Sequence, residues 1–206
     1  HPLTTTGADF LSLFPHVSVM PDADPCVLVV EDEGELARLY AKWLSETYRV
    51  ETAYGGPEAL NALDALGAEI DVALLDRRMD AITGDDVLAE IRDRDLDCQV
   101  SMVTAVTPDF DIVELSFDEY LVKPLSKEGL VDSVAELLDR RAYDETVQEL
   151  LTLVSKRDLL EREKDSPELM DAAPYEELTD RIDTLRERLD DRDGSLPPPA
   201  RQAIVD

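Results

Sequence analysis

The sequence has few cysteines, few aromatic residues and few positive charges. Only Cys26 and Cys98 occur among its 206 residues, and each begins an apolar run. If both begin strands of one sheet with another strand between them, they lie about 9 Å or more apart, beyond the reach of a disulfide. We therefore expect two buried free thiols, as is usual in a reducing cytoplasm.

Positive charge is outnumbered by negative charge throughout. The chain has 48 acidic and 20 basic residues, giving a formal net charge of -28, and only five of the basic residues are lysine. Such a charge repels itself in the folded state, and salt screens that repulsion. The composition favours a cytoplasmic protein of a halophile over an ordinary acidic protein. It disfavours direct nucleic-acid binding, because phosphate contacts need a basic surface.

Long apolar runs are also missing. No stretch approaches the roughly 18 uninterrupted apolar residues of a membrane span, so we expect no membrane association. Residues 1–20 lack the basic start and long apolar core of a secretory signal. Because Met20 directly precedes a polar lead-in to the first apolar run, we interpret it as the natural start and residues 1–20 as a disordered N-terminal extension. Residues 193–206, which contain Pro197–Pro199, are predicted to be a disordered tail.

Between residues 24 and 139, apolar runs of strand length alternate with segments of helical periodicity. Five strands are expected, in CVLVVED, YRVETA, DVALLDRRMD, CQVSMVTAV and DEYLVKP. Helices are expected after the first three of these strands, and a short helix with Pro108 in its first turn is expected after the fourth. This alternation predicts an α/β fold with a doubly wound, five-stranded parallel sheet covered on both faces.

Chemically distinctive residues stand where the predicted strands end. The first strand ends at Glu31 and Asp32, the third at Asp76, the fourth at Thr104 and the fifth at Lys123. In such sheets, ligands bind at the carboxyl ends of the strands. Converging carboxylates repel each other unless a hard divalent cation or a lysine neutralises them. We therefore predict a Mg²⁺ site with a lysine beside it, suited to stabilising phosphoryl oxygens on a carboxylate.

These motifs, in this order, resemble the receiver domain of two-component response regulators. The resemblance rests on the acidic pair in VLVVEDE, on LLD, on Gly84 eight residues after Asp76, on MVTA and on YLVKP. It covers roughly residues 26–138 and implies the flavodoxin-like strand order 2-1-3-4-5.

The resemblance also implies roles for individual residues. Asp76 would accept a phosphoryl group from a phosphohistidine of a sensor histidine kinase. Asp32 would bind Mg²⁺ directly and Glu31 through a water, with Asp76 and the backbone carbonyl of Arg78 as further ligands.

Other positions would support the phosphoryl group or respond to it. Lys123 would pair with the phosphoryl oxygens, and Pro124 would follow a cis peptide bond. Thr104 and Tyr120 would form the switch pair: Thr104 moves to bond the phosphoryl group, and Tyr120 then turns inward. Gly84 would form the turn after the acceptor strand.

Two positions depart from the usual receiver pattern. Glu31 stands where Asp is commoner, and Asp80 stands where Pro is common. Arg77 and Arg78 are unusual in being basic beside the acceptor. They would offset the extra carboxylate or contact the kinase, but a solvated loop pair is the interpretation we favour.

Residues 140–192 are predicted to be helical. Apolar periodicity continues without a break from Lys127 to about Lys164, and Ser166-Pro167 ends it. A coiled-coil seam at alternating spacings of three and four follows, formed by Tyr175, Leu178, Ile182, Leu185 and Leu189. The seam needs a partner, either the preceding helix folded back as a hairpin or the same helix of a second chain. Through RRAYDETVQELLTLVSKRDLLEREK and YEELTDRIDTLRERL, the region resembles the HalX domain found after receivers in halophilic archaea.

The sequence thus predicts a cytoplasmic response regulator in which phosphorylation of Asp76 biases self-association or partner binding through the C-terminal helices. Catalysis would be limited to slow self-dephosphorylation. A homodimer would form through the helical region or the receiver face. Two alternatives stay open: a DNA-binding transcriptional regulator, for which the sequence offers no helix with clustered Arg or Lys, and a phosphorelay intermediate.

Overall fold

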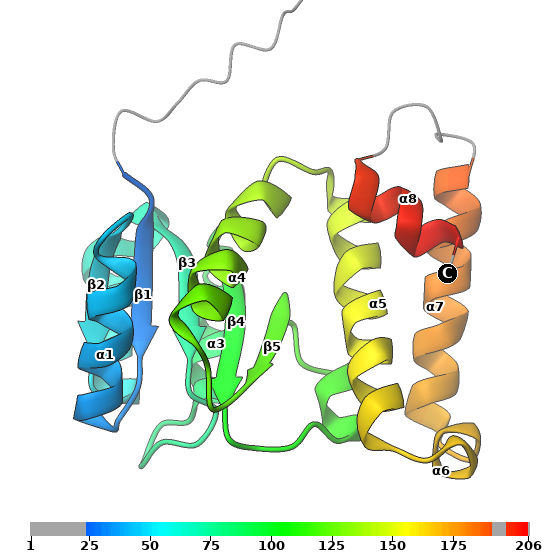
Figure 1. Ribbon diagram of the computed structural model, residues 1–206, viewed down its shortest axis with the longest axis horizontal. Coiled ribbons are helices and arrows are strands. Elements are labelled where there is room, and N and C mark those ends of the chain that lie inside the picture. Colours follow the sequence, from blue (N-terminus) through cyan, green and yellow to red (C-terminus); the bar gives the residue numbers. More distant parts are fainter. Residues whose placement is uncertain (1–23, 191–196, 206) are drawn as a thin grey trace, which may run out of the picture.

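The computed structural model describes residues 24–190 and 197–205, and its central feature is one five-stranded sheet. All strands are parallel, in the predicted order β2-β1-β3-β4-β5. The strands are β1 (Cys26–Val30), β2 (Arg49–Ala53), β3 (Ile70–Leu75), β4 (Gln99–Thr104) and β5 (Glu119–Val122). Helices α1 (Gly34–Leu44) and α4 (Lys127–Arg140) cover the near face of the sheet in Figure 1. Helices α2 (Gly56–Leu66) and α3 (Gly84–Asp93) cover the far face.

Strand β1 illustrates why the sheet is buried on both faces. All five of its residues are buried. Val27 and Val29 pack into the core under α1 and α4, whereas Leu28 and Val30 pack into the core on the opposite face. Successive side chains of a strand point to opposite faces, so a continuous apolar run is typical of a sheet covered on both sides.

The two cysteines are free and buried, as predicted. Cys26 begins β1, and Cys98 immediately precedes β4. Strand β3 lies between these two strands, which keeps the thiols apart.

The connection between β4 and β5 contains only a short 3-10 helix, η2 (Phe110–Val113). The helix expected here is therefore a 3-10 helix of four residues, and it begins after Pro108 instead of including it. The Asp109 carboxylate accepts a hydrogen bond from the Phe110 N–H at 2.8 Å. Ile112 and Phe117 are almost fully buried, so this short segment contributes large apolar side chains to the core.

The C-terminal region forms α5 (Glu145–Glu163), a one-turn α6 (Ser166–Met170), α7 (Ala173–Asp190) and α8 (Pro198–Val205). The prediction of one helix continuing from Lys127 to Lys164 is wrong, because α4 ends at Arg140 and α5 begins at Glu145. Asp144 has an extended backbone, and its carboxylate accepts a hydrogen bond from the Val147 N–H at 3.2 Å. Such an N-cap starts a new helix even where the apolar periodicity is unbroken.

The coiled-coil seam packs against α5 of the same chain, which is the hairpin alternative. Helices α5 and α7 lie side by side in Figure 1. The seam residues Leu178, Ile182, Leu185 and Leu189 are all buried. Their core is continuous with the core on the α2 and α3 face of the sheet. The hairpin is therefore packed onto the sheet domain rather than held apart from it.

The prediction of a disordered tail over 193–206 is wrong for Pro198–Val205, which form α8. Prolines 198 and 199 occupy the first turn, where a missing N–H breaks no helical hydrogen bond. Ala200 and Ala203 are buried, and α8 contacts both α5 and α7. Residues 193–196 and 206 of the predicted tail, and residues 1–20 with the proposed start at Met20, lie outside the described residues.

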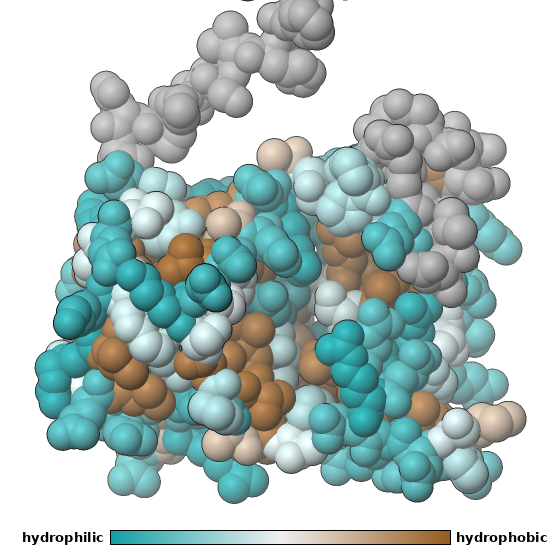
Figure 2. Space-filling model, viewed as in Figure 1, coloured by the Kyte–Doolittle hydropathy of each residue, from teal (hydrophilic) through white to brown (hydrophobic). Residues whose placement is uncertain are grey.

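Hydrophilic side chains cover most of the face shown in Figure 2, in keeping with the acidic composition. Within residues 24–190 and 197–205, no helix combines the length and apolar character needed to cross a membrane.

Candidate functional site

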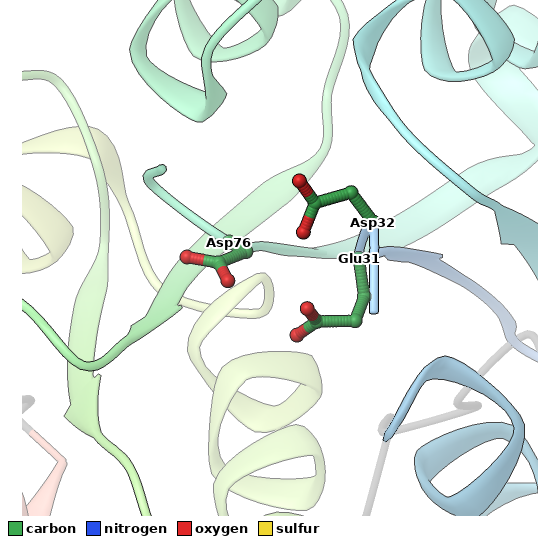
Figure 3. A group of neighbouring side chains, drawn as sticks. All are labelled: Glu31, Asp32 and Asp76. Atoms are coloured by element: carbon green, nitrogen blue, oxygen red, sulfur yellow. The ribbon is translucent and has the colours of Figure 1, made fainter. Parts of the chain in front are cut away.

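Three carboxylates meet at the carboxyl ends of two neighbouring strands. Glu31 and Asp32 follow β1, and Asp76 follows β3. Their side chains face a common space in Figure 3, and one oxygen from each lies within 4.8 Å of the others. Glu31 and Asp76 are buried, whereas Asp32 is exposed. An all-oxygen donor set with several negative charges fits a hard divalent cation.

Lys123 completes this cluster from the end of β5. Its Nζ lies 2.5 Å from Oε2 of Glu31 and 2.6 Å from Oδ2 of Asp76. Its own N–H donates to the Thr104 carbonyl at 2.9 Å, and the peptide bond to Pro124 is cis. Burial lowers the pKa of Lys123, but its bonds to the two carboxylates outweigh that effect and leave the pKa above its ordinary value. A charged ammonium therefore stands beside Asp76.

For Glu31, burial has a larger effect on the pKa than the bond to Lys123 does. Burial raises the pKa of Glu31 above its ordinary value, and Lys123 offsets this only in part, while the charge of Asp76 adds to it. Its Oε1 accepts a hydrogen bond from the Glu33 N–H at 3.2 Å. A buried carboxylate beside a second one gains from any added positive charge, which supports the fit to a cation.

Gly84 lets the start of α3 pass close to Asp76. A Cβ at this residue would lie 2.3 Å from the carbonyl oxygen of Asp76, which no side chain tolerates. The Gly84 N–H donates to the Arg77 carbonyl at 3.1 Å. Thr83 caps α3 through a capping box with Asp86. The loop after β3 is thus fixed against the helix that follows it.

The two predicted switch residues are linked through a residue that the sequence did not identify. Thr104 is fully buried, and its Oγ1 accepts a hydrogen bond from the Val106 N–H at 3.2 Å. The Tyr120 hydroxyl donates to the Val106 carbonyl at 2.7 Å. The Tyr120 ring is turned inward, the orientation that the predicted switch gives it only after phosphorylation, and its centroid lies 5.6 Å from that of Phe117. Burial raises the pKa of Tyr120, and nearby Arg77 partly offsets this effect.

The favoured interpretation of Arg77 and Arg78 as a solvated pair is wrong for Arg77. Its side chain is only 12% exposed, with Nε 3.1 Å from Asp85 Oδ1 and an ion pair to Asp111. Asp111 follows Arg77 by 34 residues, and no motif spacing links the two. Arg78 is exposed, and its N–H donates to Asp76 Oδ1 at 3.1 Å. Asp80 is exposed as well.

Comparison with known proteins identifies two regions of similarity. A family model described as the response regulator receiver domain matches residues 27–135. A second, described as the HalX domain, matches residues 139–198.

Individual relatives are similar over more than half of this chain. A Haloferax volcanii protein named as a transcriptional regulator is 48% identical over 165 residues, which are 80% of this chain and 28% of the relative. Sensory transduction protein RegX3 of Mycobacterium tuberculosis is 36% identical over 124 residues, which are 58% of this chain and 53% of the relative. The chain therefore spans well under two thirds of either relative.

A solved structure is similar over little more than half of this chain. Chemotaxis protein CheY4 of Vibrio cholerae aligns with a TM-score of 0.53 and 28% identity over 57% of this chain and all of that protein. The haloarchaeal relative agrees with the halophilic character indicated by the acidic composition.

Proposed function

The chain belongs to the response regulator receiver family and carries a HalX domain after its receiver, and on that premise we propose that it is a two-component response regulator phosphorylated on Asp76. In this proposal the receiver spans residues 24–139 and the HalX-like domain residues 140–192. The observation that carries it is the ammonium of Lys123, 2.6 Å from Asp76 and 2.5 Å from Glu31, at the carboxyl edge of the sheet.

The proposed donor is a phosphohistidine of a sensor histidine kinase. An oxygen of the Asp76 carboxylate attacks the phosphorus, so that an O–P bond forms while the N–P bond breaks. The bonding electron pair leaves with the imidazole nitrogen, and the product is an aspartyl phosphate. Arg78 orients the attacking carboxylate through its N–H, and the ammonium of Lys123 stabilises the phosphoryl oxygens.

Mg²⁺ is the proposed cofactor. Glu31, Asp32, Asp76 and the backbone carbonyl of Arg78 would hold it, and once bound it would neutralise charge on the phosphoryl oxygens. Support comes from the three carboxylates within 4.8 Å of one another and from the burial that raises the pKa of Glu31.

The proposed response begins at Thr104. When Thr104 moves to donate its O–H to the phosphoryl group, its oxygen still accepts from the Val106 N–H and draws Val106 with it. The Val106 carbonyl then shifts relative to the Tyr120 hydroxyl that it binds. This change biases self-association or partner binding through the C-terminal helices. The protein acts in the cytoplasm as a signalling protein, and slow self-dephosphorylation is its only catalysis.

The name of the Haloferax volcanii relative favours transcriptional regulation as a second candidate function. The matched residues make up only 28% of that relative, so its name is weak support for the same function in this chain. On α7, Arg181 pairs with Glu149, and Arg186 lies 3.5 Å from Asp183. Arginines neutralised in this way do not favour contacts with phosphates.

Light scattering in high salt tests the proposal. We expect wild type to change its mass on addition of Mg²⁺ and beryllofluoride, an analogue of the phosphoryl group, and Asp76→Ala to remain unchanged. Calorimetry on the same samples reports whether the analogue binds. Lack of binding by wild type would overturn the acceptor assignment. Binding without a change in mass would overturn only self-association as the output.

A further inference from the structure

The connection between β4 and β5 is held from two sides. Residues 109–117, which include η2 and which we call the η2 segment, face the loop after Asp76 on one side and α5 on the other. On the acceptor side, the ion pair of Arg77 with Asp111 joins the segment to the residue directly after Asp76. Asp85 at the start of α3 also binds the Arg77 guanidinium, which fixes its direction.

On the opposite side, Lys156 of α5 binds backbone oxygens of the segment. Its Nζ lies 3.2 Å from the Val113 carbonyl and 2.5 Å from the Leu115 carbonyl. The same Nζ lies 4.9 Å from the centre of the Phe117 ring. Lys156 is only 3% exposed, and no ion pair of the described residues includes it. An ammonium buried without a carboxylate is costly unless such acceptors are present, so this contact depends on the position of the segment.

Lys164, at the end of α5, binds the beginning of the segment. Its Nζ lies 2.9 Å from Oδ1 of Asp109 and 5.2 Å from the centre of the Phe110 ring. Glu168 of α6 lies 3.0 Å from the same Nζ. Two of the five lysines in the chain, one on α5 and one at its C-cap, therefore contact one short segment of the receiver.

We propose that Lys156 and Lys164 hold the η2 segment against movement and that Arg77 is a positioning residue that transmits this restraint to the acceptor site. The inference rests on the proposed function. The Thr104 hydroxyl accepts from the Val106 N–H, so a Thr104 side chain that moves to donate to a phosphoryl group draws Val106, in the connection that leads to the η2 segment, with it. Lys156 and Lys164 restrain the same connection between β4 and β5, a few residues further along the sequence.

Coupling between two sites is reciprocal. If Lys156 and Lys164 oppose the movement, then removing them strengthens binding of a phosphoryl group at Asp76. Phosphorylation in turn weakens the contact between the η2 segment and α5. The docking of the HalX helices and the occupancy of the acceptor site therefore control each other.

Calorimetric titration of the full chain with beryllofluoride in the presence of Mg²⁺ tests the coupling. Lys156→Met and Lys164→Met should bind the analogue about three- to tenfold more tightly than wild type. Lys127→Met is the matched control, because Lys127 pairs with Glu46 on the surface, away from the η2 segment. This control should bind with wild-type affinity.

The role of Arg77 is tested in the same titration. In an Arg77→Met background, Lys156→Met should no longer change the affinity, and Arg77→Lys should restore part of the effect. A role limited to stabilising the fold would leave the effect of Lys156→Met unchanged in that background, and this result would overturn the assignment of Arg77.

Hydrogen exchange supplies a second measurement, whose comparison of the variant with wild type needs no bound analogue. Backbone amides of residues 110–117 should exchange faster in Lys156→Met than in wild type, and faster in wild type after beryllofluoride is added. Variants that bind the analogue no more tightly than wild type, or that leave this exchange unchanged, would overturn the coupling alone. Failure of wild type to bind, shared by Asp76→Ala, would overturn the proposed function, and the coupling with it.

Discussion

Two regions of this molecule bring distant residues together in different ways. At the carboxyl edge of the sheet, strand register places Lys123 beside Glu31 and Asp76. Between α5 and the η2 segment, the Lys156 ammonium binds the carbonyls of Val113 and Leu115, which lie 43 and 41 residues earlier in the chain. They meet because a helix packs against an irregular segment. The first arrangement follows from the regular geometry of a parallel sheet. The second depends on how two non-repeating surfaces fit, which no sequence period describes.

Helices α1 and α5 also differ in how regularly their buried residues are spaced. Helix α1 is covered on one side and buries Ala37, Tyr40 and Leu44 at helical spacing. Helix α5 lies between the receiver and α7, and it buries residues all along its length: Val147, Leu150, Leu151, Lys156 and Leu160. A helix packed on two sides does not show a single apolar stripe. Its buried lysine therefore resembles a surface lysine in the sequence.

The largest expected effect tests how rigid the carboxyl edge of the sheet is around Asp76. Gly84→Ala should reduce the free energy of unfolding by about 3 kcal/mol, because the added methyl meets the Asp76 backbone and neither element can yield without strain. Urea denaturation in high salt measures this loss. Gly129→Ala in α4 is the matched control, since its nearest contact is Ser126 Oγ at 3.3 Å, and it should stay within about 1 kcal/mol of wild type. Equal stabilities of the two variants would contradict the close approach.

The next effect concerns charge at the same edge. Lys123→Met should weaken binding of beryllofluoride with Mg²⁺ about 100-fold, as expected for the loss of one positioned donor to the phosphoryl oxygens. Lys127→Met, which removes an exposed ammonium, should bind as wild type does. Calorimetric titration measures both affinities. An affinity of Lys123→Met within threefold of wild type would show that the ammonium does not act on the phosphoryl group.

The sequence predicted well what depends on regular geometry. The five-stranded parallel sheet and the meeting of Asp76 with Lys123 follow from strands that end at one edge, whereas the strand order was implied by the resemblance to receiver domains. The break between α4 and α5 was missed because a single N-cap, Asp144, interrupts an otherwise helical pattern. Helix α8 was missed because its proline-rich start has the composition of a disordered segment.

The contacts that could not be predicted are those made by long basic side chains. Arg77 reaches Asp111, and Lys156 reaches two carbonyls, across elements whose relative placement the sequence does not specify. One signal was available for the lysines, since only five occur in the chain, and a scarce residue is more informative than a common one. The same scarcity points to Lys156 and Lys164 as much as to Lys123.

The smallest effect tests whether Lys156 is desolvated in the folded protein. Burial lowers the pKa of Lys156 from 10.5 to about 8. Between these two values the unfolded chain holds more protons than the folded chain, so this residue makes stability rise with pH. The cost of burying the ammonium is fully present below about pH 8 and is lost progressively as pH rises from there to 10.5. Between about pH 7 and pH 9, the free energy of unfolding of wild type should therefore rise by about 1 kcal/mol relative to that of Lys156→Met.

The comparison with Lys156→Met isolates this residue because other groups that titrate in the window are common to both proteins. Burial raises the pKa of the Cys98 thiol to about 12, which lowers stability as pH rises above about 9, but equally in the two chains. Lys127→Met, lacking an exposed ammonium instead, should follow the wild-type curve. A stability difference between wild type and Lys156→Met that stays constant with pH would mean that water reaches the ammonium. The contact between α5 and the η2 segment would then resemble a surface ion pair, and the contrast between the two regions would be lost.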